Sequence, residues 1–156
     1  MDDRSNNTKT YTLKQKLASL YSYVSRRLGI LEIPNVILSK DKNNAENAFG
    51  LTGYYDHGTK TIRIYITDRL DTDILRSFAH EIIHHWQNER GTLQSKENAS
   101  VPTDHDTVPH YAQNDTWLRK REMEAYLFGN ILFRDWQDEN RNGPSKNVPF
   151  LPQPYD

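Results

Sequence analysis

The chain has 156 residues, which suits one domain rather than two, and its 20 Lys and Arg against 21 Asp and Glu give a net charge of −1. That balance offers no general attraction for a nucleic acid, and neither a signal segment nor an apolar run of roughly 18 residues is present, so we expect a cytoplasmic protein with no nucleic-acid or membrane partner. The absence of cysteine excludes disulfides and thiolate ligands, which leaves His, Asp and Glu as the side chains available to a metal.

The N-terminal part of the chain predicts one helix. Residues 1–9 are polar, and we expect them to be disordered. From Thr10 to Leu28 the apolar residues recur every three or four positions, which is the period of an amphipathic helix. Gly29 follows at the position where a helix C-cap favours glycine.

Three short strands are expected after this helix. Asn35 to Ser39 is a short apolar run, and residues 40–47 are a polar loop. The stretches Ala48 to Tyr55 and Thr61 to Thr67 flank Asp56-His57-Gly58, and the second of them alternates apolar and polar residues. Together they predict a β-hairpin.

Two further helices are predicted in the second half of the chain. The first runs to about Asn88, and three residues are candidates for its N-cap: Asp71, Thr72 or Asp73. Residues 89–115 show no sustained period and predict a long loop. The next helix begins near Asp115 or Thr116 and ends at about Gln137, and the proline-rich tail, residues 138–156, is expected to be extended.

The first of these helices contains the sequence His-Glu-Ile-Ile-His at residues 80–84. A spacing of four residues is slightly more than one helical turn, so His80 and His84 project from one face and can bind one ion, while Glu81 can reach a water beside it. The alternative is that they are surface histidines on an amphipathic helix. His85 lies about 100° around the helix from His84, and we expect it to be packed or hydrogen-bonded.

The motif needs a further ligand, because catalytic zinc usually binds three protein side chains and keeps one position open. Position 90 is arginine, which excludes the metzincin pattern with a third histidine six residues after the second. Four candidates remain elsewhere in the chain: His105, His110, Glu122 and Glu124.

Helix phase favours Glu122 as that third ligand. Glu122 lies within the apolar stripe of the last predicted helix, whereas Glu124 points towards the opposite face. A carboxylate among apolar residues is costly unless its charge is compensated, and either a metal ion or a buried ion pair with an arginine such as Arg63 or Arg76 would do so. Two small residues on the same face, Ala125 and Gly129, would let this helix approach the one that carries the histidines.

The segments HEIIH and REMEAY resemble the gluzincin zinc metallopeptidases, in which a glutamate from a second helix joins the two motif histidines. The predicted order of one helix, three strands and two helices is similar to the minimal domain of small phage- and mobile-element-encoded peptidases and of Spartan-like proteins. The resemblance covers about residues 10–137. It implies an α+β, zincin-like metallopeptidase domain over these residues, with the third ligand on the second helix after the sheet.

By this resemblance one zinc ion is bound by three side chains: His80, His84 and Glu122. Glu81 corresponds to the general base. Tyr126 departs from the pattern, because relatives often have Asp or Asn there to orient a ligand histidine, so another residue must do this here. Spartan-like proteins use a third histidine instead, which keeps His105 and His110 open as ligands.

The resemblance also implies hydrolysis of peptide bonds in a protein or peptide substrate. In the resembling families the substrate peptide pairs with an edge strand beside the active-site helix. Thr61 to Thr67 is the expected strand, because it directly precedes that helix. Three loop residues are candidates to donate to an oxyanion: His105, His110 and Tyr111. The alternative function is a metal-stabilised protein-binding module that does not cleave, but such a site has no use for a base at Glu81.

Overall fold

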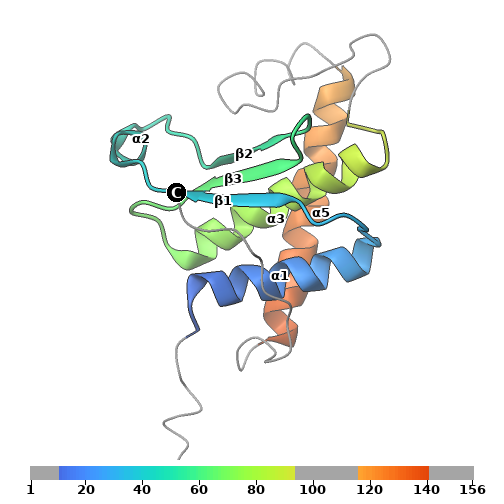
Figure 1. Ribbon diagram of the computed structural model, residues 1–156, viewed down its shortest axis with the longest axis horizontal. Coiled ribbons are helices and arrows are strands. Elements are labelled where there is room, and N and C mark those ends of the chain that lie inside the picture. The colour runs from blue at the N-terminus through green and yellow to red at the C-terminus, as the bar shows by residue number, and fades with distance from the viewer. Residues whose placement is uncertain (1–10, 94–115, 141–156) are drawn as a thin grey trace, which may run out of the picture.

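A computed structural model describes residues 11–93 and 116–140 of the chain. Within these residues it has an α+β fold with four helices and one three-stranded sheet (Figure 1). The elements are α1 (Leu13–Leu28), β1 (Asn35–Ser39), α2 (Lys42–Glu46), β2 (Gly53–Asp56), β3 (Thr61–Tyr65), α3 (Asp71–Glu89) and α5 (Thr116–Glu139). The predicted α+β class is confirmed. None of the described helices is long and apolar enough to cross a membrane.

Helix α1 has well-formed ends. The Thr12 side chain accepts from the backbone N–H of Gln15 and the Gln15 side chain accepts from that of Thr12, which forms a capping box. Gly29 ends the helix in the left-handed region at a φ of 72°, so the predicted glycine C-cap is confirmed.

The predicted N-cap of α3 is wrong. Leu70 occupies the cap position and makes no side-chain hydrogen bond there, while Asp71 and Asp73 lie inside the first turn. Carboxylates in the first turn are stabilised by the positive end of the helix dipole. Asp71 also pairs with Lys16 of α1 at 2.9 Å, a contact between distant residues that local sequence does not reveal.

The sheet has the order β1-β3-β2, with β1 parallel and β2 antiparallel to β3. The expectation that Thr61 to Thr67 is an edge strand is therefore wrong. Residues Thr61–Tyr65 pair with β1 on one side and β2 on the other, so their backbone groups are used within the sheet. Among the described strands, β1 and β2 form the edges.

Strand β2 is shorter than predicted and begins at Gly53. A Cβ at that position would lie 2.7 Å from the carbonyl oxygen of Arg63, so the close pairing of β2 with β3 needs a glycine. The preceding residues do not belong to the strand, and Phe49 is 90% exposed. Residues 42–46, which fall in the predicted polar loop, form the short helix α2.

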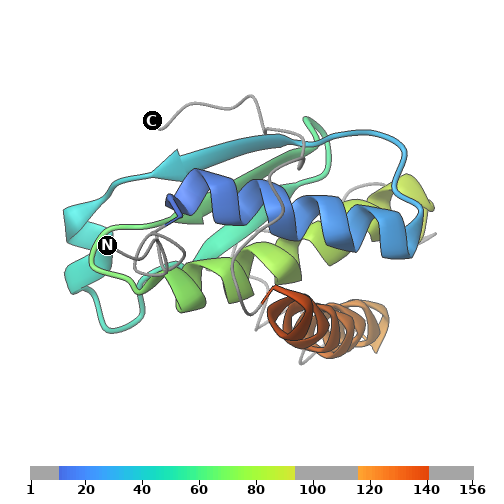
Figure 2. The same cartoon turned by 90° about the horizontal axis from the view of Figure 1, so that it is seen from below.

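Helix α3 lies at the centre of the fold. Figure 2 shows α1 and α3 against the same face of the sheet, and α5 packed on α3 from the side away from the sheet. The core between these layers is made of aliphatic and aromatic residues from all of them, including Leu20, Val24, Ile62, Ile64, Phe78, Ile82 and Phe133. Packing on three sides constrains both the position and the rotation of α3.

Helices α3 and α5 end slightly later than predicted, at Glu89 and Glu139. The expected loop 89–115 and tail 138–156 therefore begin at residues 90 and 140. The expectations for residues 1–9, for most of the loop and for most of the tail lie outside the described residues.

Helix α5 comes close to the backbone of α3 at Gly129. A Cβ on Gly129 would lie 3.2 Å from the His80 Cα and 3.3 Å from its backbone nitrogen. Ala125, one turn earlier, is fully buried. The predicted role of these two small residues in bringing the helices together is confirmed.

We predict that Gly129→Val destabilises the protein by about 1–3 kcal/mol, because its branched side chain would force α5 away from α3. Helix propensity alone slightly favours valine over glycine, so a loss reports the steric contact. Urea unfolding followed by circular dichroism measures the change. Leu127→Val, at a position that is 57% exposed on the same helix, is the control, and an equal loss in both variants would contradict the prediction.

Candidate metal centre

The side chains of His80, His84 and Glu122 meet at one point between α3 and α5. The Nε2 atom of His80 lies 3.0 Å from Oε1 of Glu122, and the Nε2 atom of His84 lies 3.1 Å from Oε2 of the same carboxylate. The three residues each offer one ligand atom, and these atoms lie within 4.8 Å of one another. The structure thus brings together the three residues that the sequence favoured as metal ligands.

This cluster is shielded from water to different degrees. The side chains of His80, His84 and Glu122 are 15%, 5% and 23% exposed. The two imidazole rings are edge to face with centroids 4.9 Å apart, and the Tyr126 ring lies edge-on to His80 at 5.2 Å. His84 is therefore the most buried of the three side chains, and Glu122 is the most exposed.

The charges of the cluster stabilise each other. Burial alone would lower the pKa of the His84 imidazole, but the hydrogen bond and the negative charge of Glu122 raise this pKa to about 9. Burial likewise raises the pKa of Glu122, yet the hydrogen bonds from His80 and His84 hold it well below the usual range. A carboxylate at this position is therefore ionised, which is the form that binds a cation.

Gln87 orients the His84 ring, and sequence reasoning did not identify it. The Nδ1 atom of His84 lies 2.8 Å from Oε1 of Gln87, and because an amide oxygen can only accept, Nδ1 must carry the hydrogen. This leaves Nε2 of a neutral His84 with the lone pair that a metal needs. Gln87 thus makes the orienting contact with His84 that the sequence analysis expected from a residue other than Tyr126.

Gln87 is itself held by α5. It is completely buried, and its amide nitrogen donates to the carbonyl oxygen of Arg121 at 3.0 Å and to Glu124 at 2.8 Å. The same amide thus fixes a histidine on α3 relative to α5. In the sequence, only its position one turn after His84 indicates that Gln87 could contact this histidine. Its partners on α5 cannot be recognised there, because they depend on the fold.

His85 is not part of the cluster. It is buried, its Nε2 lies 2.6 Å from the carbonyl oxygen of Glu32, and its Nδ1 lies 2.8 Å from the Tyr55 hydroxyl. Since a carbonyl can only accept, the Glu32 contact places the proton on Nε2 and leaves Nδ1 to accept from Tyr55. This hydrogen-bonded role agrees with the sequence expectation.

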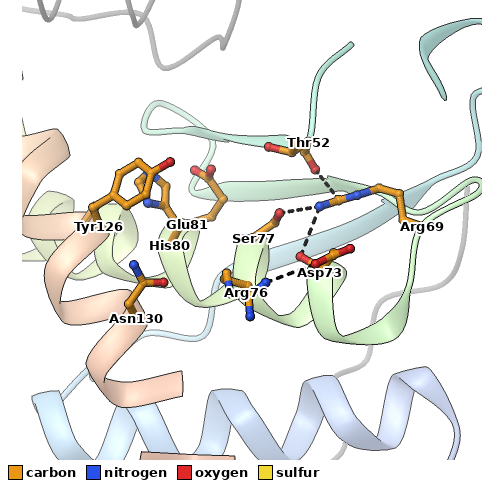
Figure 3. Close-up of a pocket in the computed structure, with 10 residues that line it drawn as sticks. Thr52, Arg69, Asp73, Arg76, Ser77, His80, Glu81, Tyr126 and Asn130 are labelled. Carbon is orange, nitrogen blue, oxygen red and sulfur yellow. Dashed lines mark hydrogen bonds and ion pairs between the residues drawn. The ribbon is translucent and has the colours of Figure 1, made fainter. Parts of the chain in front are cut away.

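Glu81 lies beside the cluster and lines a cavity of about 300 Å³ between α3, α5 and the start of β2 (Figure 3). His80 lines the same cavity, together with Thr52 from the sheet side and Tyr126 and Asn130 from α5. Glu81 is only 2% exposed. A candidate base therefore shares a small polar cavity with one of the candidate metal ligands.

The other residues that the sequence analysis considered, as a third ligand, as an ion-pair partner of Glu122 or as an oxyanion donor, either have other contacts or lie outside the described residues. Glu124 accepts from Gln87 and lies 3.6 Å from Arg121. Arg76 pairs with Asp73, and Arg63 bonds Tyr54 and Ser39, so the arginines considered as partners of Glu122 have other contacts. His105, His110 and Tyr111 lie outside the described residues.

Comparison of the chain with models of protein families, with curated proteins and with solved structures found no match.

We predict that Glu122→Ala abolishes stoichiometric zinc binding, because it removes the carboxylate that faces both histidines. Metal analysis of the purified variant and titration calorimetry measure this loss. Asp135→Ala, which removes a more exposed carboxylate of the same helix, should keep zinc. If Glu122→Ala retains full zinc while His105→Ala or His110→Ala loses it, the third ligand is a histidine instead.

We predict that Gln87→Leu lowers zinc affinity about 10- to 100-fold, the usual effect of losing a group that orients a ligand histidine. Competition with a chromophoric chelator measures the affinity. Ser19→Ala is the control for stability, because it removes a buried hydrogen bond of 2.9 Å from Trp136 away from the cluster. Equal zinc affinity in Gln87→Leu and wild type would show that the orienting bond is unimportant.

Proposed function

We propose that the protein is a zinc-dependent metallopeptidase with a zincin-like domain. The observation that carries this proposal is the meeting of His80, His84 and Glu122 at one point, with Glu81 in the adjoining cavity. A purely structural metal site would usually have four protein ligands and no acidic group beside it. Three convergent ligands and a neighbouring carboxylate favour a catalytic site.

The geometry of the cluster fits a zinc ion. Ligand atoms about 2.1 Å from a tetrahedral zinc lie roughly 3.4 Å apart. The two separations between a Glu122 oxygen and a histidine nitrogen are slightly shorter, at 3.0 and 3.1 Å, and the ligand atoms of all three residues lie within 4.8 Å of one another. Side-chain rotations would bring the three atoms to the spacing that the ion needs. Two imidazoles and one carboxylate also form a donor set that zinc commonly takes.

Glu81 would be the general base of the reaction. Zinc held by the cluster would supply a Lewis acid that polarises the scissile carbonyl and makes a water molecule more acidic. Glu81 would take a proton from the attacking water as the new C–O bond forms, and pass it to the nitrogen as the peptide C–N bond breaks. This role is supported by the burial of Glu81 and by the cavity that it shares with His80.

Strand β2, one edge of which has no partner strand within the described residues, is the proposed binding strand for the substrate in place of the β3 strand expected from the sequence. Strand β2 lies at an edge of the described sheet, and the residue before it, Thr52, lines the cavity with Glu81. A peptide that pairs with this edge by strand addition would run past the base. Its backbone would be held by hydrogen bonds that do not depend on its side chains.

We predict that Glu81→Gln lowers the rate of hydrolysis by about 10² to 10⁴, because the amide cannot act as the base. Zinc content should stay at one ion per chain, since Glu81 is not a ligand in this scheme. The measurement is cleavage of unfolded casein by zinc-loaded protein, followed by gel electrophoresis and mass spectrometry.

Two outcomes would overturn this assignment. If zinc-loaded Glu81→Gln cleaves as fast as wild type, Glu81 is not the base. If zinc-loaded wild type cleaves no unfolded protein at all, the alternative of a metal-stabilised binding module is favoured.

A further inference from the structure

The cavity beside Glu81 is lined mainly by residues whose side chains carry a polar or charged group. Its lining consists of Thr52, Arg69, Asp73, Arg76, Ser77, His80, Glu81, Ala125, Tyr126 and Asn130. Ala125 is the only aliphatic residue among them. With a volume of about 300 Å³, the cavity is large enough for one long side chain.

Two guanidinium groups line this cavity, and they differ in their partners. Arg76 is bonded to Asp73 at 3.1 Å and is about half exposed. Arg69 donates four hydrogen bonds to neutral acceptors, namely the carbonyl oxygens of Thr52, Tyr65 and Asp73 and the hydroxyl of Ser77, at 2.7–3.1 Å. Within the described residues, no carboxylate is in salt-bridge contact with Arg69.

The charge of Arg69 is thus only partly balanced. Figure 3 shows its guanidinium next to Ser77 and Thr52, on the side of the cavity away from Tyr126. Asp73 is already engaged by Arg76, and Figure 3 shows Glu81 beside His80, between Tyr126 and Ser77. The end of the cavity formed by Arg69, Arg76 and Ser77 therefore carries two guanidinium groups against the one carboxylate of Asp73. Arg76 and Ser77 can donate hydrogen bonds there, whereas the four terminal N–H groups of Arg69 are already bonded.

We propose that this cavity binds the side chain of a substrate residue next to the scissile bond and selects an acidic one, Asp or Glu. The inference rests on the proposed peptidase function and adds a substrate class to it. A carboxylate in the cavity would accept hydrogen bonds from the donors at its far end and compensate the charge of Arg69. An apolar side chain would displace water from these polar groups and offer neither a hydrogen bond nor a charge in return, which disfavours it.

The position of the cavity suits this role. Asp73, Arg76 and Ser77 precede His80 on α3 by seven, four and three residues, so they follow the face of the helix that also carries the first candidate ligand. Thr52 joins the cavity to the edge of β2. A peptide lying on that edge would therefore place one side chain into the cavity while its backbone passes Glu81.

The test uses zinc-loaded full-length protein and peptides based on a site that it cleaves in casein. The residue on each side of the cleaved bond is replaced in turn by Glu, Gln, Leu or Lys, and kcat/KM is measured by mass spectrometry. We expect Glu to be preferred over Gln by about tenfold at one of the two positions, and over Leu and Lys by more. Binding of the same peptides to zinc-loaded Glu81→Gln, followed by fluorescence anisotropy, should show the same order.

The second part of the test reverses the charge of Arg76, which lines the cavity. Arg76→Glu should reverse the preference from Glu to Lys, whereas Arg134→Glu, an equal change of net charge at an exposed position of α5, should leave the preference as in wild type. Arg76→Gln, which should reduce the preference without reversing it, replaces Arg76→Glu if circular dichroism shows that the latter is unfolded.

The outcomes separate the two proposals. If wild type cleaves casein but shows no preference for Glu at either position, or if Arg76→Glu and Arg76→Gln keep the wild-type preference, the acidic-residue inference is wrong and the peptidase proposal stands. If no unfolded protein or peptide is cleaved, the peptidase proposal fails. Anisotropy then decides separately whether the cavity binds the Glu peptide more tightly than the Gln peptide.

Discussion

The close packing of α5 against α3 is the constraint on which the candidate site depends. Gly129 allows the two backbones to approach at His80, and that approach brings the Glu122 carboxylate within 3.0–3.1 Å of two imidazoles. Because this carboxylate is largely shielded from water, it needs an opposite charge nearby. Without a metal, His84 supplies it, since its pKa of about 9 keeps it protonated at neutral pH. A bound cation would take over the same role, so the helices need not rearrange between the two states.

The rigidity of the cluster comes from contacts beyond its three members. Gln87 connects His84 to the backbone of Arg121 and the side chain of Glu124. These bonds lie in a fully buried position, where water cannot replace them. The orientation of one ring on α3 is therefore coupled to the position of α5. A substitution that separates the helices would disturb both the carboxylate and the ring that it faces.

Features set by helical periodicity were predictable from the sequence. The spacing of His80 and His84, and the phase of Glu122 on its helix, place all three at the α3–α5 interface, as expected. Features set by contacts between distant segments were not. The family resemblance, together with the position of Thr61 to Thr67 directly before α3, suggested that β3 is an edge strand. Its parallel pairing with β1 links residues 26 positions apart in the chain, such as Asn35 and Thr61. The hydrogen bonds from Gln87 to α5 were not predictable either. They depend on the distance between two helices, and the periodicity of a single helix does not give that distance.

Arg69 shows how one side chain can relate the sheet to the candidate base. Its guanidinium binds the carbonyl oxygen of Thr52 just before β2, that of Tyr65 at the end of β3, and two groups in the first two turns of α3. It therefore fixes the position of the β2 edge of the described sheet relative to the helix that carries Glu81. Lysine could not replace it, because a single ammonium cannot reach acceptors that the planar guanidinium spans with two nitrogens. The same geometry leaves a positive charge facing the cavity, so the bonds that position the proposed binding strand also determine the charge that a bound side chain would meet.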